Sequence, residues 1–186
     1  SLIDNSGPVG LRTRGANFLF SWYLLNRAGG ATQNSDGSYT DNGGAAFIQS
    51  LIGSGVTGAA NYRDTFIEAD PFSVADFSTL FLEYALSVFN NSVTTSIVSD
   101  SRYTLSPLYR DFYTNGQVGL NLNTLVTGGI ATTDFSSGES SVSASVRQLG
   151  LAYVRYRASE SGTTFFTLEN PNGHEGKLFL GAIKTN

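Results

Sequence analysis

The amino-acid sequence predicts an α+β fold, with a helix-rich N-terminal half packed on a C-terminal antiparallel β-sheet and an extended N-terminal arm. Up to about residue 116 the apolar residues recur with helical spacing, and beyond it they alternate with polar or small residues as in strands. Helices followed by strands are typical of α+β domains. No change of composition marks a linker, so the 186 residues fit an arm of residues 1–15 and a single domain of residues 16–186.

The first 15 residues predict the extended arm because Pro8 and three glycines disfavour a helix. Four apolar residues are spread along this arm: Leu2, Ile3, Val9 and Leu11. An extended segment can satisfy its backbone by pairing with the exposed edge of a sheet, often in another chain. We therefore expect the arm to dock on a neighbouring subunit, with these four side chains as anchors.

The N-terminal half predicts two helices separated by a loop. Residues 16–28 read as a helix that ends at Gly29 and Gly30, and residues 45–52 as a shorter one. The intervening residues, GGATQNSDGSYTDNGG, are rich in turn formers and predict a loop. Residues 61–72 favour no single element.

Residues 73–90 give the strongest helical pattern. Ser73 and Asp76 have the spacing of a capping box, in which each side chain bonds the backbone amide of the other. The rest of the segment is apolar except for one narrow stripe, made of Asp76, Thr79, Glu83, Ser87 and Asn90. We expect Phe81 and Leu82 in the core, and Glu83 at the surface. A further helix is predicted from Ser106-Pro107 to about residue 116.

The C-terminal half predicts strands at residues 117–126, 141–157, 163–169 and 177–183. In the second of them, alternation places Tyr153, Arg155 and Arg157 on one face and Val154 and Tyr156 on the other. A face that carries both tyrosine and arginine suits a subunit contact and an anionic ligand equally well.

His174 is the only histidine, and it lies in NPNGHEG between the last two predicted strands. Asn-Gly is a strong hairpin signal, so we expect His174 on an exposed turn and without a chemical role, the alternative being a metal or haem ligand. With no cysteine, one histidine, no nucleophile elbow and no phosphate-binding glycine loop, the sequence predicts no catalytic residues, metal site or cofactor.

Two weaker motifs allow alternative interpretations. Asn34, Asp36 and Asp41 partly imitate a calcium-binding loop, but Thr32 occupies the first ligand position and Gly43 the position of the closing glutamate. Ordinary turn chemistry explains the same residues. Asn90-Asn91-Ser92 matches the N-glycosylation sequon, a short pattern that also arises by chance.

Charged residues make up only 14% of the chain, against about 25% in ordinary soluble domains, and the net charge is -4. This acidic balance without a basic run argues against nucleic-acid binding. No apolar run is long enough to span a membrane. A charge-poor chain without sulfur that starts at Ser1 is typical of secreted or cell-surface material from which an N-terminal segment was removed; an intracellular domain is the alternative.

These observations favour a non-enzymatic structural subunit that assembles with copies of itself outside the cell or on a particle surface, as a filament, coat or surface layer. The first alternative is a secreted binding module for a carbohydrate, haem or protein partner. The second is a hydrolase whose site is not contiguous in sequence.

Overall fold

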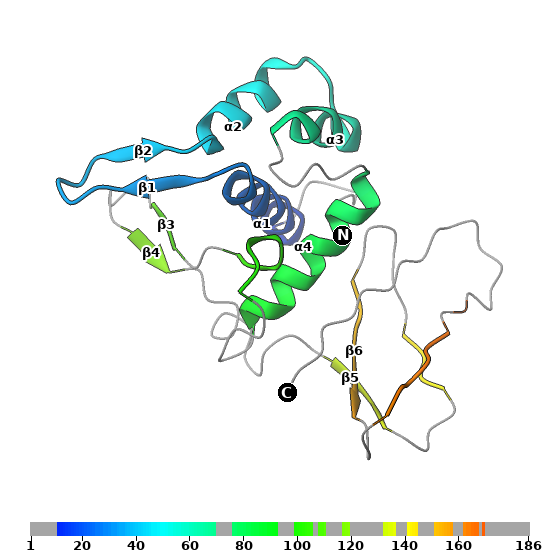
Figure 1. Ribbon diagram of the computed structural model, residues 1–186. Helices are drawn as coiled ribbons and strands as arrows, with labels where there is room; N and C mark the ends of the chain where they lie inside the picture. Colours follow the sequence, from blue (N-terminus) through cyan, green and yellow to red (C-terminus); the bar gives the residue numbers. More distant parts are fainter. Residues whose placement is uncertain are drawn as a thin grey trace.

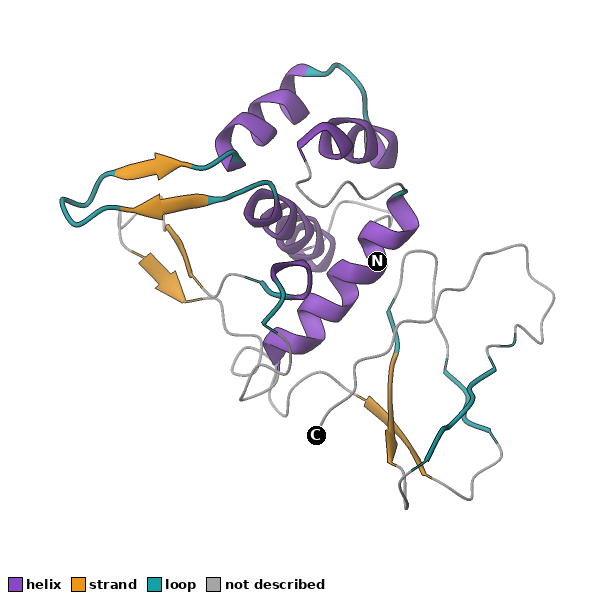
Figure 2. Cartoon of the chain, in the orientation of Figure 1, coloured by secondary structure: helices purple, strands orange, loops and turns teal. Residues whose placement is uncertain are grey.

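The computed structural model in Figure 1 describes residues 11–69, 76–92, 99–105, 108–110, 117–119, 132–136, 141–144, 151–157, 162–167 and 169. It confirms a mixed α+β fold with a helix-rich N-terminal half (Figure 2). The helices are α1 (Leu11–Arg27), α2 (Gly44–Gly53), α3 (Gly58–Ala69), α4 (Phe77–Ser92) and the short 3-10 helix η1 (Ser101–Tyr103). None of the helices in these ranges combines the length and apolarity needed to cross a lipid bilayer.

Helix α1 begins earlier than the sequence predicted. Leu11 is its first residue, so residues 11–15 are helical and the expected arm is wrong over this part. Gly15 costs a helix only about 1 kcal/mol relative to alanine, a penalty that packing of the rest of α1 overrides. The other three predicted anchors, Leu2, Ile3 and Val9, lie outside the described residues.

The core is built from aromatic side chains on the helices. The ring of Phe20, on α1, lies 5.0 Å from that of Tyr84 and 5.3 Å from that of Tyr62, measured between centroids, and both contacts are edge-on. Such contacts contribute beyond the area they bury. The buried apolar residues of the described chain all fall between positions 20 and 105: Phe20, Tyr23, Leu24, Ala28, Phe47, Phe66, Leu80, Tyr84, Ala85, Val88 and Leu105.

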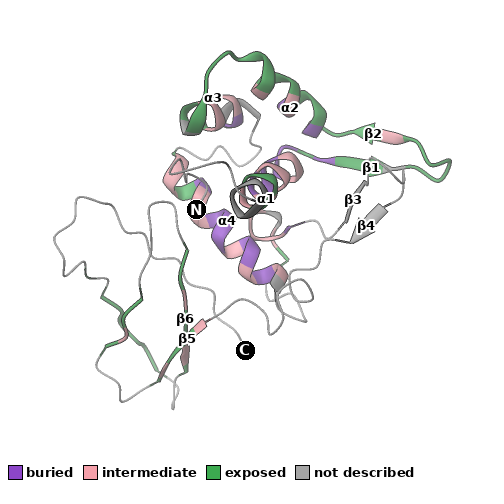
Figure 3. Cartoon of the chain, turned by 180° about the vertical axis from the view of Figure 1, so that it is seen from behind, coloured by how far each residue is buried: buried purple, intermediate pink, exposed green. Residues whose placement is uncertain are grey.

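Helix α4 is the central helix, and no residue from Leu80 to Asn91 is exposed (Figure 3). The polar stripe faces solvent only at its start, where Asp76 and Thr79 are exposed. For Glu83, Ser87 and Asn90 the expectation of a surface position is wrong, because all three are buried. Phe81 and Leu82, expected in the core, are only half-buried. The buried part of the stripe meets polar groups inside the protein, since Glu83, Ser87 and Asn90 each have a hydrogen-bond partner there.

The start of α4 also differs from the predicted capping box. Asp76 precedes the helix, and its carboxylate accepts hydrogen bonds from the Thr79 amide and the Thr79 hydroxyl, both at 2.9 Å. Asp76 is therefore the residue that caps the helix, three positions after the predicted Ser73, which lies outside the described residues.

This cap gives a first prediction. Asp76→Ala should lower the free energy of unfolding by about 1 kcal/mol, because it leaves an amide of the first turn without its acceptor. Chemical denaturation measures the loss, and Asp76→Asn, which retains an acceptor oxygen, is the matched control. Equal losses for the two variants would contradict the capping role.

A β-hairpin replaces the loop expected at residues 29–44. Strand β1 (Ala31–Gln33) pairs antiparallel with β2 (Tyr39–Asp41). The hairpin closes at its base where Gly29 and Gly30 meet Asn42, Gly43 and Gly44, and the Gly30 carbonyl accepts from the Asn42 amide at 3.0 Å. A Cβ on Gly29 would lie 1.9 Å from the Asn42 carbonyl oxygen. Gly29, Gly43 and Gly44 are thus required by close backbone contacts, and Gly30 by its φ of 64°. Loop signals alone did not reveal these contacts.

The described strands of the C-terminal half are paired differently from the prediction. Strand β3 (Leu108–Arg110) pairs antiparallel with β4 (Gln117–Gly119), so the predicted helix at residues 106–116 is wrong. Strand β5 (Thr132–Ser136) was not predicted, and it pairs with β6 (Tyr153–Arg157) in parallel rather than antiparallel. Residues 141–144 and 162–167 are not in strands, and the predicted strand at 177–183 lies outside the described residues.

Candidate functional site

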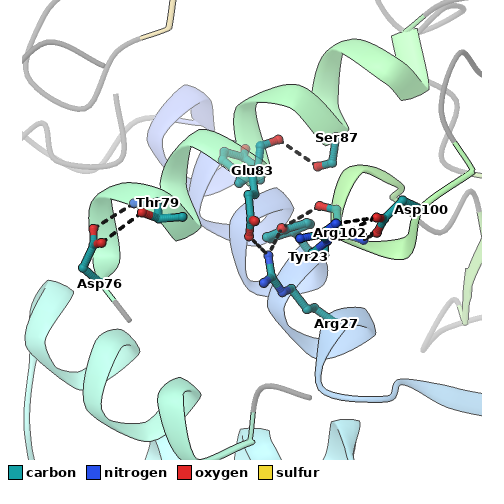
Figure 4. Close-up of polar contacts among 9 residues, drawn as sticks. Tyr23, Arg27, Asp76, Thr79, Glu83, Ser87, Asp100 and Arg102 are labelled. Atoms are coloured by element: carbon teal, nitrogen blue, oxygen red, sulfur yellow. Dashed lines mark hydrogen bonds and ion pairs between the residues drawn. The ribbon is translucent and has the colours of Figure 1, made fainter. Parts of the chain in front are cut away.

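The buried polar stripe of α4 forms an ionic network with α1 and η1 (Figure 4). The Arg27 guanidinium, on α1, donates to the Glu83 carboxylate and, at 2.7 Å, to the Tyr23 hydroxyl. The Tyr23 hydroxyl in turn donates to the backbone carbonyl of Arg102 at 2.8 Å. Three elements that are far apart in sequence are therefore tied together by one continuous chain of polar contacts.

Aromatic rings surround the Arg27 guanidinium. Its central carbon lies 5.9 Å from the centroid of the Tyr23 ring and 5.7 Å from that of Phe66. Both distances allow cation–π attraction, which strengthens where water is excluded. The Arg27 side chain has no exposed surface and that of Glu83 is 10% exposed. The pair therefore ties α1 to α4 within the core.

A second ion pair marks the outer end of this network. Asp100 pairs with Arg102, whose terminal nitrogen lies 2.7 Å from the carboxylate. Hydrogen bonds from Arg102 hold the pKa of Asp100 below its usual value, and the charge of Arg27 contributes in the same direction. Both side chains are about one-third exposed, so this pair links the buried network to the surface.

The remaining polar residues of the stripe bond the backbone. Ser87 donates to the Tyr84 carbonyl, and the Asn90 side-chain amide donates to the Tyr103 carbonyl at 2.8 Å. Asn90 is buried, so the sequon nitrogen is not accessible in the folded chain. A glycan at Asn90 would require this part of the core to open.

The predicted tyrosine–arginine face lies on β6 and has two parts. Tyr153 is its anchor: the hydroxyl donates to the Ala85 carbonyl on α4 at 2.8 Å, and the ring stacks on Phe89 with centroids 5.4 Å apart. Burial raises the pKa of the Tyr153 hydroxyl. Tyr153 therefore serves an internal contact and is not open to a ligand.

Arg155 and Arg157 extend beyond this anchor into solvent. Arg155 makes two hydrogen bonds to Asp134 of β5, at 2.9 and 2.8 Å, which lower the pKa of the Asp134 carboxyl. Arg157 lies 3.8 Å from the same carboxylate. Since the three side chains are half-exposed or more, these ion pairs contribute little to stability.

The most exposed apolar surface of the described chain lies in and next to the β5–β6 ribbon. Phe165 is 91% exposed, and Phe166 and Val154 are nearly half exposed. The Phe166 ring packs edge-on against Tyr156 at 5.0 Å, and Tyr156 in turn contacts Phe135 of β5. Sequence reasoning missed this surface, because Phe165 and Phe166 resemble core residues of a strand until their exposure is known.

The residues of the weak calcium candidate all lie on the β1–β2 hairpin, Asn34 and Asp36 between its strands and Asp41 at the end of β2. Asp36 accepts from the Ser38 amide and hydroxyl, and these bonds hold the pKa of its carboxyl down. Asp41 accepts from the Ala45 amide at 2.8 Å and so caps α2. Asn34 donates to the Ser38 and Thr40 hydroxyls. Turn and cap chemistry accounts for all three residues. Among the described residues, no three histidine, aspartate or glutamate side chains gather as a metal site would require.

His174, predicted to lie on an exposed turn and to have no chemical role, lies outside the described residues. A scan against protein-family models, a search of curated proteins and a search of solved structures each find no match to this chain.

Proposed function

We propose that this protein is a structural subunit that assembles with copies of itself, in an extracellular or particle-surface setting. The observation that carries this proposal is the group of exposed apolar side chains in and next to the β5–β6 ribbon: Val154 on β6, and Phe165 and Phe166 in the segment that packs against Tyr156. Exposed apolar patches of this kind mark interaction sites, whereas scattered single residues do not. The low content of charged residues supports the extracellular setting.

The polar chemistry of the chain supports a structural role rather than catalysis. The most buried charges, Arg27 and Glu83, are enclosed by aromatic rings and satisfy each other. The exposed carboxylates of Asp36 and Asp41 are engaged by backbone amides. These polar groups of the described residues are thus engaged in contacts within the fold. The exposed apolar side chains in and next to the ribbon remain available for binding.

A pair of serine variants tests this proposal. Phe165→Ser should reduce assembly of the full chain, raising the concentration of half-association about tenfold or more, because a large aromatic contact at an interface centre is worth more than about 1.4 kcal/mol. Ile52→Ser is the matched control, since Ile52 is a 79% exposed apolar residue on α2, in the helical half of the protein.

Light scattering after size exclusion, over a range of concentrations, measures both variants. Loss of assembly in both, or in neither, would argue against the ribbon as the contact surface. If instead the parent is monomeric and the Phe165 variant loses retention on an immobilised oligosaccharide, the carbohydrate-binding alternative replaces the proposal.

A further inference from the structure

We infer that the β5–β6 ribbon docks reversibly on helix α4, with the Tyr153 side chain as its latch, and that the helical half, from α1 to η1, keeps its fold when the ribbon is released. This inference concerns a movement within one chain and does not depend on the proposed function. Figure 1 shows the ribbon to one side of the helices rather than among them.

Tyr153 is the residue through which β6 contacts the helical half. Its hydroxyl donates to the Ala85 carbonyl of α4 at 2.8 Å, and its ring stacks on that of Phe89 with centroids 5.4 Å apart. The next two residues of β6, Val154 and Arg155, are exposed. The docking of β6 on α4 therefore depends on one side chain.

The two strands of the ribbon also hold each other, independently of the helices. They pair in register along the whole length of both strands. Arg155 makes two hydrogen bonds to Asp134 across the pair, and the rings of Phe135 and Tyr156 lie 5.6 Å apart. None of these contacts involves α4, so the ribbon stays one unit when Tyr153 leaves its site.

Release of Tyr153 leaves the hydrogen bonds of α4 in place. A backbone carbonyl has two lone pairs, and inside a helix it already accepts from the amide four residues further on. The Ala85 carbonyl lies within α4, so the bond from Tyr153 is added to the helical bond and does not replace it. The released Tyr153 hydroxyl can bond water instead, so release leaves no polar group without a partner.

The helical half has a core that does not include the ribbon. The described residues of this core all lie between Leu19 and Leu105, and the buried pair of Arg27 and Glu83 joins α1 to α4 within it. No residue of β5 or β6 is buried. One neutral hydrogen bond and one aromatic pair contribute far less stability than such a core, so the ribbon opens before the helices do.

Spin labels test the docking, and the absence of native cysteine makes their placement specific. In the full chain, Ile52→Cys and Arg157→Cys together place one label on the helical half and one on the ribbon, both at exposed positions. We expect a narrow distribution of distances between the two labels. Adding Tyr153→Ala should raise the fraction of molecules with a released ribbon, seen as a broad second component, by about tenfold or more. Tyr156→Ala, the matched control on the same strand, should keep the narrow distribution.

Amide hydrogen exchange in α1 distinguishes release of the ribbon from unfolding of the helices. In Tyr153→Ala, exchange of residues 19–24 should match that of the parent. Tyr153→Phe, which keeps the ring on Phe89 and loses only the hydrogen bond, should release the ribbon to an intermediate extent.

Three results would overturn Tyr153 as the latch: a narrow distribution in both alanine variants, a broad one in both, or a broad one already present without either substitution. Faster exchange in α1 of Tyr153→Ala would show that the helical half needs the docked ribbon, and would overturn its independence.

Discussion

Glu83→Ala should lower the free energy of unfolding by about 3–5 kcal/mol, the usual loss when one partner of a buried ion pair is removed. The variant leaves the Arg27 guanidinium charged, with no exposed surface and without its carboxylate partner. The remaining Tyr23 hydroxyl is neutral and cannot replace it. Urea denaturation monitored by circular dichroism measures the loss.

Two further variants make this result specific to the buried pair. Asp134→Ala removes an exposed ion pair of similar geometry and should cost no more than about 1 kcal/mol. The double variant Arg27→Met with Glu83→Leu removes both charges and should recover most of the stability lost in Glu83→Ala. A loss below about 0.5 kcal/mol for Glu83→Ala would show that Glu83 behaves as a surface residue, as its sequence pattern suggested.

Gly29→Ala should lower the free energy of unfolding by about 2–6 kcal/mol, the sum of two effects. The Cβ of alanine would lie 1.9 Å from the Asn42 carbonyl oxygen, so the backbone at the base of the hairpin would have to move. Overpacking of this kind lowers stability by about 1–3 kcal/mol. Gly29 also has a φ of 121°, where a residue with a side chain is strained by about another 1–3 kcal/mol. Thermal unfolding compared with the parent measures the total.

Gly15→Ala is the control for the glycine prediction. Gly15 lies in α1, is exposed, and has nothing within 4 Å of an added Cβ. Alanine there should raise stability by about 0.5–1 kcal/mol, because it favours the helix. Destabilisation of the Gly15 variant, or an unchanged Gly29 variant, would contradict the account of the hairpin base.

The sequence predicted a helix correctly where a run of apolar residues with helical spacing ended at glycines. Gly29 and Gly30 end α1 as expected, and the predicted helix at residues 45–52 corresponds to α2. The start of α1 was less readable, because Gly15 and the residues around it favour no helix on their own. Packing of residues further along α1 decides that boundary, and such long-range contacts have no local signal.

The same limit explains the error at Glu83. A polar stripe on a helix ordinarily faces water. Nothing in residues 76–90 indicates that Glu83 has an ion-pair partner inside the protein. That partner, Arg27, is 56 residues earlier in the chain. The strands show a related limit, because alternation fixes which residues share a face but not whether neighbouring strands run parallel. Thus the faces of β6 were predicted, while its partner β5 was missed.

The sequence predicted the surface at β6 only in part, because it does not show which side chains are engaged by other parts of the fold. Tyr153, Arg155 and Arg157 were correctly predicted to share one face of β6. However, Tyr153 is hydrogen-bonded to α4 and Arg155 to Asp134. The apolar side chains that carry the proposal, Val154, Phe165 and Phe166, resemble core residues in a sequence. Only their exposure in the folded chain distinguishes a binding surface from a core.

Sedimentation velocity on the intact chain, over a hundredfold range of concentration, tests self-assembly most directly. The sequence mass is 19.8 kDa. If copies of the chain associate, we expect the weight-average mass to rise above that of one chain as the concentration increases. A mass that stays at 19.8 kDa over the whole range would contradict self-assembly and leave the exposed apolar side chains in and next to the ribbon to a different partner.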